Sequence, residues 1–112
     1  MLLSTFQVTY PEFRALWTSP NTGAQVTQFL AMAALEMDQY IWGAPLDTGP
    51  GTPLSNYDSA HGLLTAHKLA LTPFGQNARM VAKQGLGYDR TTYGTEYKLA
   101  QRRTASGYRV TA

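Results

Sequence analysis

The sequence predicts an all-α fold, a small helical bundle of three main helices with a short additional helix near the N-terminus. In residues 21–43 and 56–71 the apolar side chains recur at intervals of three and four, which is the period of a helix with one buried face. Prolines lie outside both stretches and gather in the segments between them.

The first residues predict an arm followed by a short helix. Residues 1–9 alternate only weakly between apolar and polar types, so we expect a flexible or extended N-terminal arm. Pro11 suits the first turn of a helix, where its missing N–H is not needed, and Glu12 favours the positive end of the helix dipole. We therefore expect a short helix from about residue 11 to residue 17, with Phe13, Leu16 and Trp17 buried.

Residues 21–43 form the clearest predicted helix. Asn21 or Thr22 can cap its N-terminus, Gly43 is a natural stop, and Pro45 prevents the helix from continuing. The stripe expected to be buried consists of Val26, Phe29, Leu30, Ala33, Met37, Tyr40 and Ile41.

A loop and a second long helix follow. Residues 44–54 are rich in proline and glycine and predict a loop. Ser55 and Asp58 have the spacing of a capping box, which predicts the start of a helix over residues 56–71, and Pro73 closes it. The expected buried stripe of this helix is Tyr57, Ala60, Leu64, His67 and Leu71, with Leu63 beside it.

Residues 72–90 predict a long connector, because glycines interrupt their apolar positions. Residues 79–83 can form either a short strand or a packed loop. Long connectors in small domains are often functional. The candidates for partner contact in this one are Arg79, Met80, Val81 and Lys83.

Thr91 or Thr92 can cap a final helix that runs to about Arg103. Its expected buried stripe is Tyr93, Tyr97 and Ala100, and the arginines near its end suit the negative end of the helix dipole. Residues 105–112 are expected to form an aromatic and basic C-terminal tail. The whole chain is expected to be a single helical domain.

Length and composition favour one soluble, cytosolic domain. The chain has 112 residues, of which 44% are hydrophobic and only 14% are charged. This composition provides enough apolar side chains for a hydrophobic core and has too few charges for a disordered chain. It has no cysteine, which excludes disulfides, thiolate metal sites and cysteine nucleophiles. We expect no targeting signal and no membrane partner, because the longest apolar run covers only residues 30–35.

No arrangement of residues predicts catalysis, so we expect a protein that is not an enzyme. His61 and His67 are six residues apart and point to different faces of a helix, which favours structural histidines over metal ligands. No serine lies in the G-x-S-x-G motif of a nucleophile elbow. Glu36 and Asp38 are two residues apart, so on a helix their side chains point in different directions and do not form a pair for acid–base catalysis. We therefore expect no catalytic site, no cofactor site and no metal site.

The charges are unevenly distributed along the chain. Residues 1–60 hold five carboxylates and one arginine, a net −4, whereas residues 61–112 hold eight cations and two carboxylates, a net +6. Such a chain can attract an acidic partner or stack head to tail with copies of itself. The charges can equally be solvated and contribute little.

Several strings, taken in order, resemble a family of head-to-tail connector proteins of tailed bacteriophages. The resemblance covers the chain from about Thr9 to Ala112. The strings are YPEF (10–13), WG (42–43), YDxAxxxLxAHxLAL (57–71), LTPFGQNARMV (71–81), TTYGTEY (91–97) and GYRV (107–110).

This resemblance implies a structural adaptor in the neck of the virion, made in the host cytoplasm. Such proteins are small helical bundles that form a dodecameric ring between the portal protein and a stopper or tail-terminator protein, and DNA passes through the ring without sequence-specific binding. In related connectors the C-terminal segment docks on the portal. Carried onto this sequence, that segment contains Arg102, Arg103, Tyr108, Arg109 and Val110.

The alternative interpretation is a small nucleic-acid-binding or regulatory helical domain. The basic second half with its interleaved tyrosines favours it. The charge excess is modest, however, and no recognition-helix motif is present.

Overall fold

The computed structural model describes residues 1–82 and 85–111, and the side chains of residues 105–111 lie outside the description. The described part consists of helices and their connections, which confirms the all-α prediction. In chain order the elements are α1 (Leu3–Thr9), the 3-10 helix η1 (Pro11–Leu16), α2 (Ala24–Glu36), α3 (Gln39–Trp42), α4 (Asn56–Ala70), α5 (Pro73–Asn77), the 3-10 helix η2 (Gly87–Arg90) and α6 (Thr92–Thr111).

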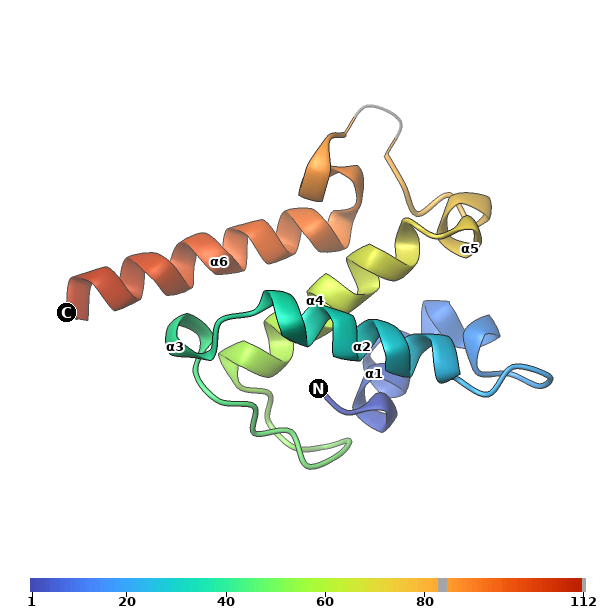
Figure 1. Ribbon diagram of the computed structural model, residues 1–112, viewed down its shortest axis with the longest axis horizontal. Coiled ribbons are helices and arrows are strands. Elements are labelled where there is room, and N and C mark those ends of the chain that lie inside the picture. Colours follow the sequence, from blue (N-terminus) through green and yellow to red (C-terminus); the bar gives the residue numbers. More distant parts are fainter. Residues whose placement is uncertain (83–84, 112) are drawn as a thin grey trace.

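Helix α4 is the central element of the bundle (Figure 1). Both α2 and α6 pack against it, and most of its residues are buried. A helix that is covered on several sides needs small or apolar residues nearly all round, and α4 supplies alanine, leucine and glycine between its few polar positions. The remaining elements are arranged around this axis.

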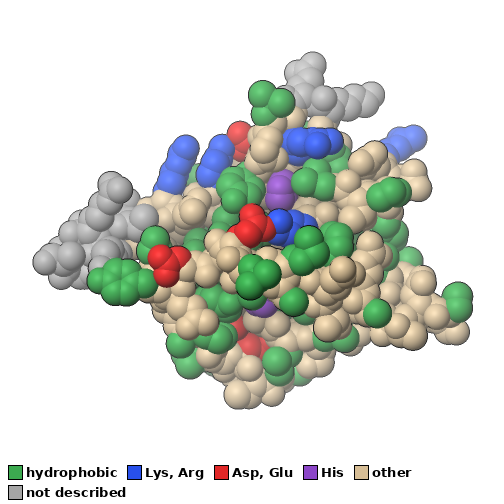
Figure 2. Space-filling model, viewed as in Figure 1, with side chains coloured by type: hydrophobic (Ala, Val, Ile, Leu, Met, Phe, Trp, Pro, Cys, Tyr) green, Lys and Arg blue, Asp and Glu red, His purple; other side chains and the backbone are tan. Residues whose placement is uncertain are grey.

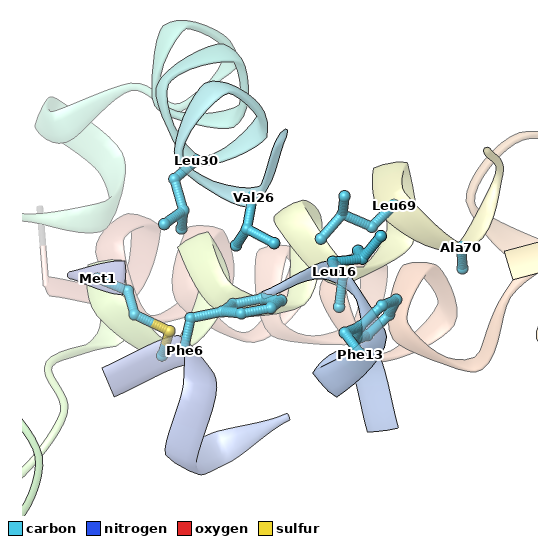
Figure 3. Close-up of a cluster of buried hydrophobic side chains, with 9 residues drawn as sticks. Met1, Phe6, Phe13, Leu16, Val26, Leu30, Leu69 and Ala70 are labelled. Carbon is cyan, nitrogen blue, oxygen red and sulfur yellow. The ribbon is translucent and has the colours of Figure 1, made fainter. Parts of the chain in front are cut away.

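The first apolar cluster joins the N-terminal elements to α2 and to the C-terminal half of α4 (Figure 3). Phe6, Phe13 and Val26 are fully buried in it. The ring centroids of Phe6 and Phe13 lie 5.8 Å apart, within the range of favourable aromatic contacts. The expected burial of Phe13 and Leu16 is confirmed, and Trp17 is half-buried.

The second apolar cluster joins α3, the N-terminal half of α4 and α6. A row of aromatic rings runs through it: Trp42 contacts Tyr97 at a centroid distance of 5.5 Å, and Tyr97 contacts Tyr88 at 5.3 Å. The Tyr88 ring in turn lies 5.4 Å from the His67 ring. This row fixes α6 and η2 against α4.

The two predicted caps at the starts of the long helices are confirmed. The Ser55 hydroxyl oxygen accepts a hydrogen bond from the Asp58 N–H (3.2 Å), and the Thr91 hydroxyl oxygen accepts one from the Gly94 N–H (2.9 Å). Gly94 also permits a close approach, because a Cβ atom there would lie 2.1 Å from the Tyr88 carbonyl oxygen.

The N-terminal amino group is buried in a polar cluster on α4, which we call the amino-terminal cluster and which consists of Met1, Asp58 and His61. The ammonium nitrogen lies 3.1 Å from Asp58 Oδ1 and 2.7 Å from His61 Nδ1. His61 Nε2 lies 2.6 Å from the Leu30 carbonyl oxygen of α2. Since a carbonyl only accepts, Nε2 carries the hydrogen and Nδ1 accepts from the ammonium.

Two further donors complete the shell of Asp58. Its Oδ2 atom accepts hydrogen bonds from the Ser55 hydroxyl (2.7 Å) and from the Leu46 N–H (2.9 Å). Burial opposes ionisation of this carboxyl, but the hydrogen bonds and the ammonium outweigh it, so the pKa of Asp58 lies below its ordinary value. The cluster therefore holds a true ion pair.

The N-terminal arm was predicted wrongly. Residues 3–9 form α1 instead of an extended arm, and Thr5 and Phe6 of this helix are buried. Tertiary contacts decide the outcome, because the Phe6 ring fills the first apolar cluster and Met1 is held by Asp58.

The single helix predicted over residues 21–43 is divided in two. Helix α2 begins after Gly23, not after Asn21 or Thr22, and ends at Glu36 because Met37 has extended backbone angles (φ −101°, ψ 131°). Asp38 then caps the short α3, its carboxylate accepting from the Tyr40 N–H at 2.9 Å. The break rotates the following residues, so Tyr40 and Ile41 are exposed and Trp42 is buried in their place.

The connector and the C-terminal tail also differ from expectation. Residues 72–90 contain α5 and η2, and no strand occurs in the described part of residues 79–83. Pro73 occupies the first turn of α5, and α4 ends before it at Ala70. The final helix was expected to end near Arg103, but its backbone continues as α6 to Thr111, so residues 105–111 are helical rather than a tail.

Substitution of Asp58 tests the amino-terminal cluster. In Asp58→Asn the amide nitrogen cannot accept from Ser55 or Leu46, and the ammonium loses its counter-ion. We expect the free energy of unfolding to fall by about 3 kcal/mol, measured by urea denaturation.

The matched control is Asp38→Asn, since Asp38 is exposed and asparagine caps a helix as well as aspartate. We expect a change below about 0.5 kcal/mol for this control. Equal losses in the two variants would show that the cluster adds nothing to stability.

Candidate functional site

The two histidines are buried in separate places and serve the structure. His61 belongs to the amino-terminal cluster, and His67 Nδ1 lies 2.7 Å from the Thr91 hydroxyl, which caps α6. Burial is the main cause that lowers the pKa of each ring, with nearby cations adding to it. Among the described residues no group of three His, Asp or Glu side chains is placed to hold a metal ion.

The carboxylates of the first half are engaged within the fold, and two of them hold the N-terminal segment. Asp58 binds the N-terminal ammonium, as described above. Asp47 accepts hydrogen bonds from the Leu2 N–H (2.7 Å) and from the Thr5 hydroxyl (2.9 Å). Neither carboxylate is available to a partner in this arrangement.

The other carboxylates of the first half also have partners inside the chain. Glu12 accepts a hydrogen bond from the Tyr93 hydroxyl at 2.6 Å, and Glu36 forms an ion pair with Lys68. Asp38 caps α3. Glu36, like Asp58, is thus compensated by a cation, whereas the other three carboxylates of this half accept only from neutral donors and keep their negative charge.

The arginines of the second half show the opposite behaviour. Lys98 is paired with Asp89 at 2.8 Å and is the main cause that lowers the pKa of this carboxyl, with Arg102 adding to it. Among the described residues, no exposed arginine of this half forms a salt bridge. Figure 2 shows basic side chains gathered over α6 and the connector before it. The exposed arginines are Arg79, Arg90, Arg102 and Arg103.

Arg79 occupies a backbone position that normally favours glycine. It follows the end of α5 with a left-handed φ of 59°. The Met80 N–H donates to the Gly75 carbonyl (2.9 Å) and the Arg79 N–H donates to the Gln76 carbonyl (3.2 Å), which together form a Schellman motif. A side chain in this conformation costs about 1 kcal/mol, so Arg79 is present despite a penalty to stability.

Arg79 and Arg90 line one surface hollow of about 570 Å³, together with Gln76, Val81 and Ala82. The two arginines are brought together by the connector, which closes on itself through a 2.6 Å hydrogen bond from the Ala82 N–H to the Arg90 carbonyl oxygen. We call this hollow the arginine hollow. Arg90 also borders a second hollow of about 340 Å³, at which Glu36, His67 and Lys68 lie.

The predicted partner-contact residues of the connector have different positions. Arg79 is exposed and Val81 lines the arginine hollow, but Met80 packs against the first apolar cluster. Lys83 lies outside the described residues.

The predicted portal-docking residues lie along the middle and the C-terminal part of α6. Arg102 and Arg103 are exposed on this helix, whereas the side chains of Tyr108, Arg109 and Val110 lie outside the description. Arg102 follows the start of α6 by about 15 Å along the helix axis, and the C-terminal end of α6 is about 30 Å from that start, so the docking residues extend away from the arginine hollow.

Arg90 was not among the residues predicted to make contacts. The one signal in the sequence is its position directly before the Thr91 cap, which places its side chain at the junction of connector and helix. Its proximity to Arg79 depends on the folding of the connector and is not visible in the sequence.

Comparison of the chain with known protein families, with curated proteins and with solved structures found no match. In the described part of the chain, no helix combines the length and the apolar character that crossing a membrane requires.

Replacement of Arg79 by glycine tests the strain at this position. Arg79→Gly relieves the left-handed strain, and we expect the free energy of unfolding to rise by about 1 kcal/mol in urea denaturation. The same change at Arg14, an exposed residue inside η1, is expected to lower it by about 0.5–1 kcal/mol, because glycine weakens a helix interior. Destabilisation by Arg79→Gly would show that the arginine side chain itself supports the fold.

Proposed function

We propose that this chain is a structural neck protein of a tailed bacteriophage. In this proposal it forms a ring, a dodecamer by resemblance to known connectors, between the portal protein and a stopper or tail-terminator protein. DNA passes through the ring without sequence-specific binding, and the mature protein resides at the head–tail interface of the virion.

The observation that carries the proposal is the projection of α6 beyond the bundle (Figure 1). The first half of this helix packs on α4, η2 and α3, while its C-terminal end extends away from them. Arg102 and Arg103 are exposed near the middle of α6, before its projecting end. A helix end that its own domain leaves uncovered is suited to docking on another protein.

The distribution of charge supports an assembly role for the second half. Its exposed arginines have no internal carboxylate partner among the described residues, whereas the carboxylates of the first half do have partners. Contacts between ring subunits would then depend mainly on packing, and the uncompensated arginines would face other proteins of the neck.

The second candidate function is nucleic-acid binding, which the same exposed arginines favour. Titration of the isolated chain with duplex DNA at low and moderate salt separates the two candidates. A neck protein is expected to show little affinity at moderate salt, whereas a nucleic-acid-binding domain retains affinity that falls steeply as salt rises.

Deletion of residues 107–112 tests the docking role of the projecting end. We expect the shortened chain to fold normally, because Tyr97 and Ala100, which pack α6 into the second apolar cluster, precede this point. We expect it to bind the portal protein of the same phage at least about tenfold more weakly. Cryo-electron microscopy of the mixture with portal would show the ring for the intact chain.

A shortened chain with unchanged circular dichroism serves as the folding control. Unchanged portal binding after the deletion would remove the C-terminal end from the docking mechanism. An intact chain that stays monomeric on purified portal would contradict the proposed function itself.

A further inference from the structure

We infer that the arginine hollow binds a carboxylate-bearing segment of a different protein. This inference deepens the proposed function by naming the chemistry of one partner, and it rests on that function for the identity of the assembly. The site is distinct from the projecting end of α6, because it lies at the opposite end of the same helix.

The first argument is the placement of two free cations in one concave site. Arg79 and Arg90 both line the hollow, and no carboxylate of the described residues is bonded to either. Arginine is the side chain best suited to bind a carboxylate through two parallel hydrogen bonds. Arg79 is moreover kept in a left-handed conformation that glycine would adopt more easily.

The second argument favours a protein partner over a nucleic acid. The neighbouring cations Lys68 and Lys98 are already paired with Glu36 and Asp89, so the free charge at the hollow is that of its own two arginines. Arg102 and Arg103 lie further along α6. Two cations in one hollow suit a short acidic segment better than a phosphate backbone, which spans many charges. Val81 and Ala82 give the hollow an apolar part.

Leu86 adds an exposed apolar side chain to the same connector. It is 86% exposed, and its carbonyl oxygen accepts from the Asp89 N–H at 3.0 Å, which holds it at the start of η2. An exposed leucine on the same connector as two arginines is compatible with a protein interface that has an apolar anchor and a polar rim.

A different protein is a better source of the carboxylate than a second copy of this chain. The chain's own acidic side chains are mostly engaged, Asp58 and Asp47 by the N-terminal segment and Glu12 by Tyr93. Glu96 is the one acidic side chain of the described residues to which no hydrogen bond or ion pair is formed. Copies of this chain therefore offer few free carboxylates to each other, and we take the complementary charge to come from another protein.

The experiment is an NMR titration of the isotope-labelled full chain with a short peptide of alternating glutamate and leucine. A peptide with glutamine in place of glutamate is the control ligand, and a short DNA duplex is the competing class. We expect the acidic peptide to shift the backbone and side-chain signals of Gln76, Arg79, Ala82 and Arg90, and the glutamine peptide to shift them little.

Variants then assign the effect to the two arginines. Arg90→Gln and Arg79→Gly are each expected to weaken peptide binding about tenfold, whereas Arg103→Gln near the middle of α6 leaves it unchanged. Arg79→Gly is the sharper variant, because relief of the left-handed strain keeps its melting temperature at or above that of the parent chain.

Three results would overturn the inference. The first is a set of NMR shifts that spreads evenly over Arg14, Arg102 and Arg103, and the second is peptide binding that survives both Arg79→Gly and Arg90→Gln. The third is duplex DNA that shifts the NMR signals of the arginine hollow at a lower concentration than the peptide does. The titration needs no ring and no portal. If the chain does not dock on portal, the proposed function fails but the peptide site in the arginine hollow does not. If the peptide does not bind in this titration, the peptide site fails but the proposed function does not.

Discussion

The buried ion pair between the N-terminal ammonium and Asp58 is the contact on which the rest of the structure depends. Neither charge is accessible to solvent, and an unpaired charge at that depth would be costly. His61 extends the pair to α2 through the Leu30 carbonyl, and the Leu46 N–H ties the loop before α4 to the same carboxylate. The N-terminal segment, α2, the loop and α4 are thus held at one point, and α4 in turn supports α6.

This arrangement has an electrostatic consequence for the surface. All five carboxylates that make the first half acidic accept bonds within the chain, although Glu12, Glu36 and Asp38 remain exposed on the outer face. The cations follow a different pattern, because two lysines are paired but the arginines of the connector and of α6 point outward without partners among the described residues. A chain with a small net charge therefore presents a locally basic surface, which suits an assembly component with acidic neighbours.

The features that could be predicted from the sequence are those that depend on neighbouring residues along the chain. The fold class, the Ser55 and Thr91 caps and the burial of Phe13 follow from spacing and residue type. The helical N-terminal segment was missed because its decisive contact joins residues 57 positions apart, and no local pattern shows such a contact. The meeting of Arg79 and Arg90 has the same origin, since the closing of the connector places them together.

Nitrogen NMR of the His61 ring across the acid range tests the central claim most directly. The account predicts a hydrogen on Nε2 and none on Nδ1, and a ring that stays neutral below its ordinary pKa of 6.5, because burial and the adjacent ammonium lower the folded-state pKa. The unfolded ring takes up a proton first, so stability falls as the pH drops below that value. A folded His61 that titrates at its ordinary pKa, or that carries its hydrogen on Nδ1, would contradict the amino-terminal cluster.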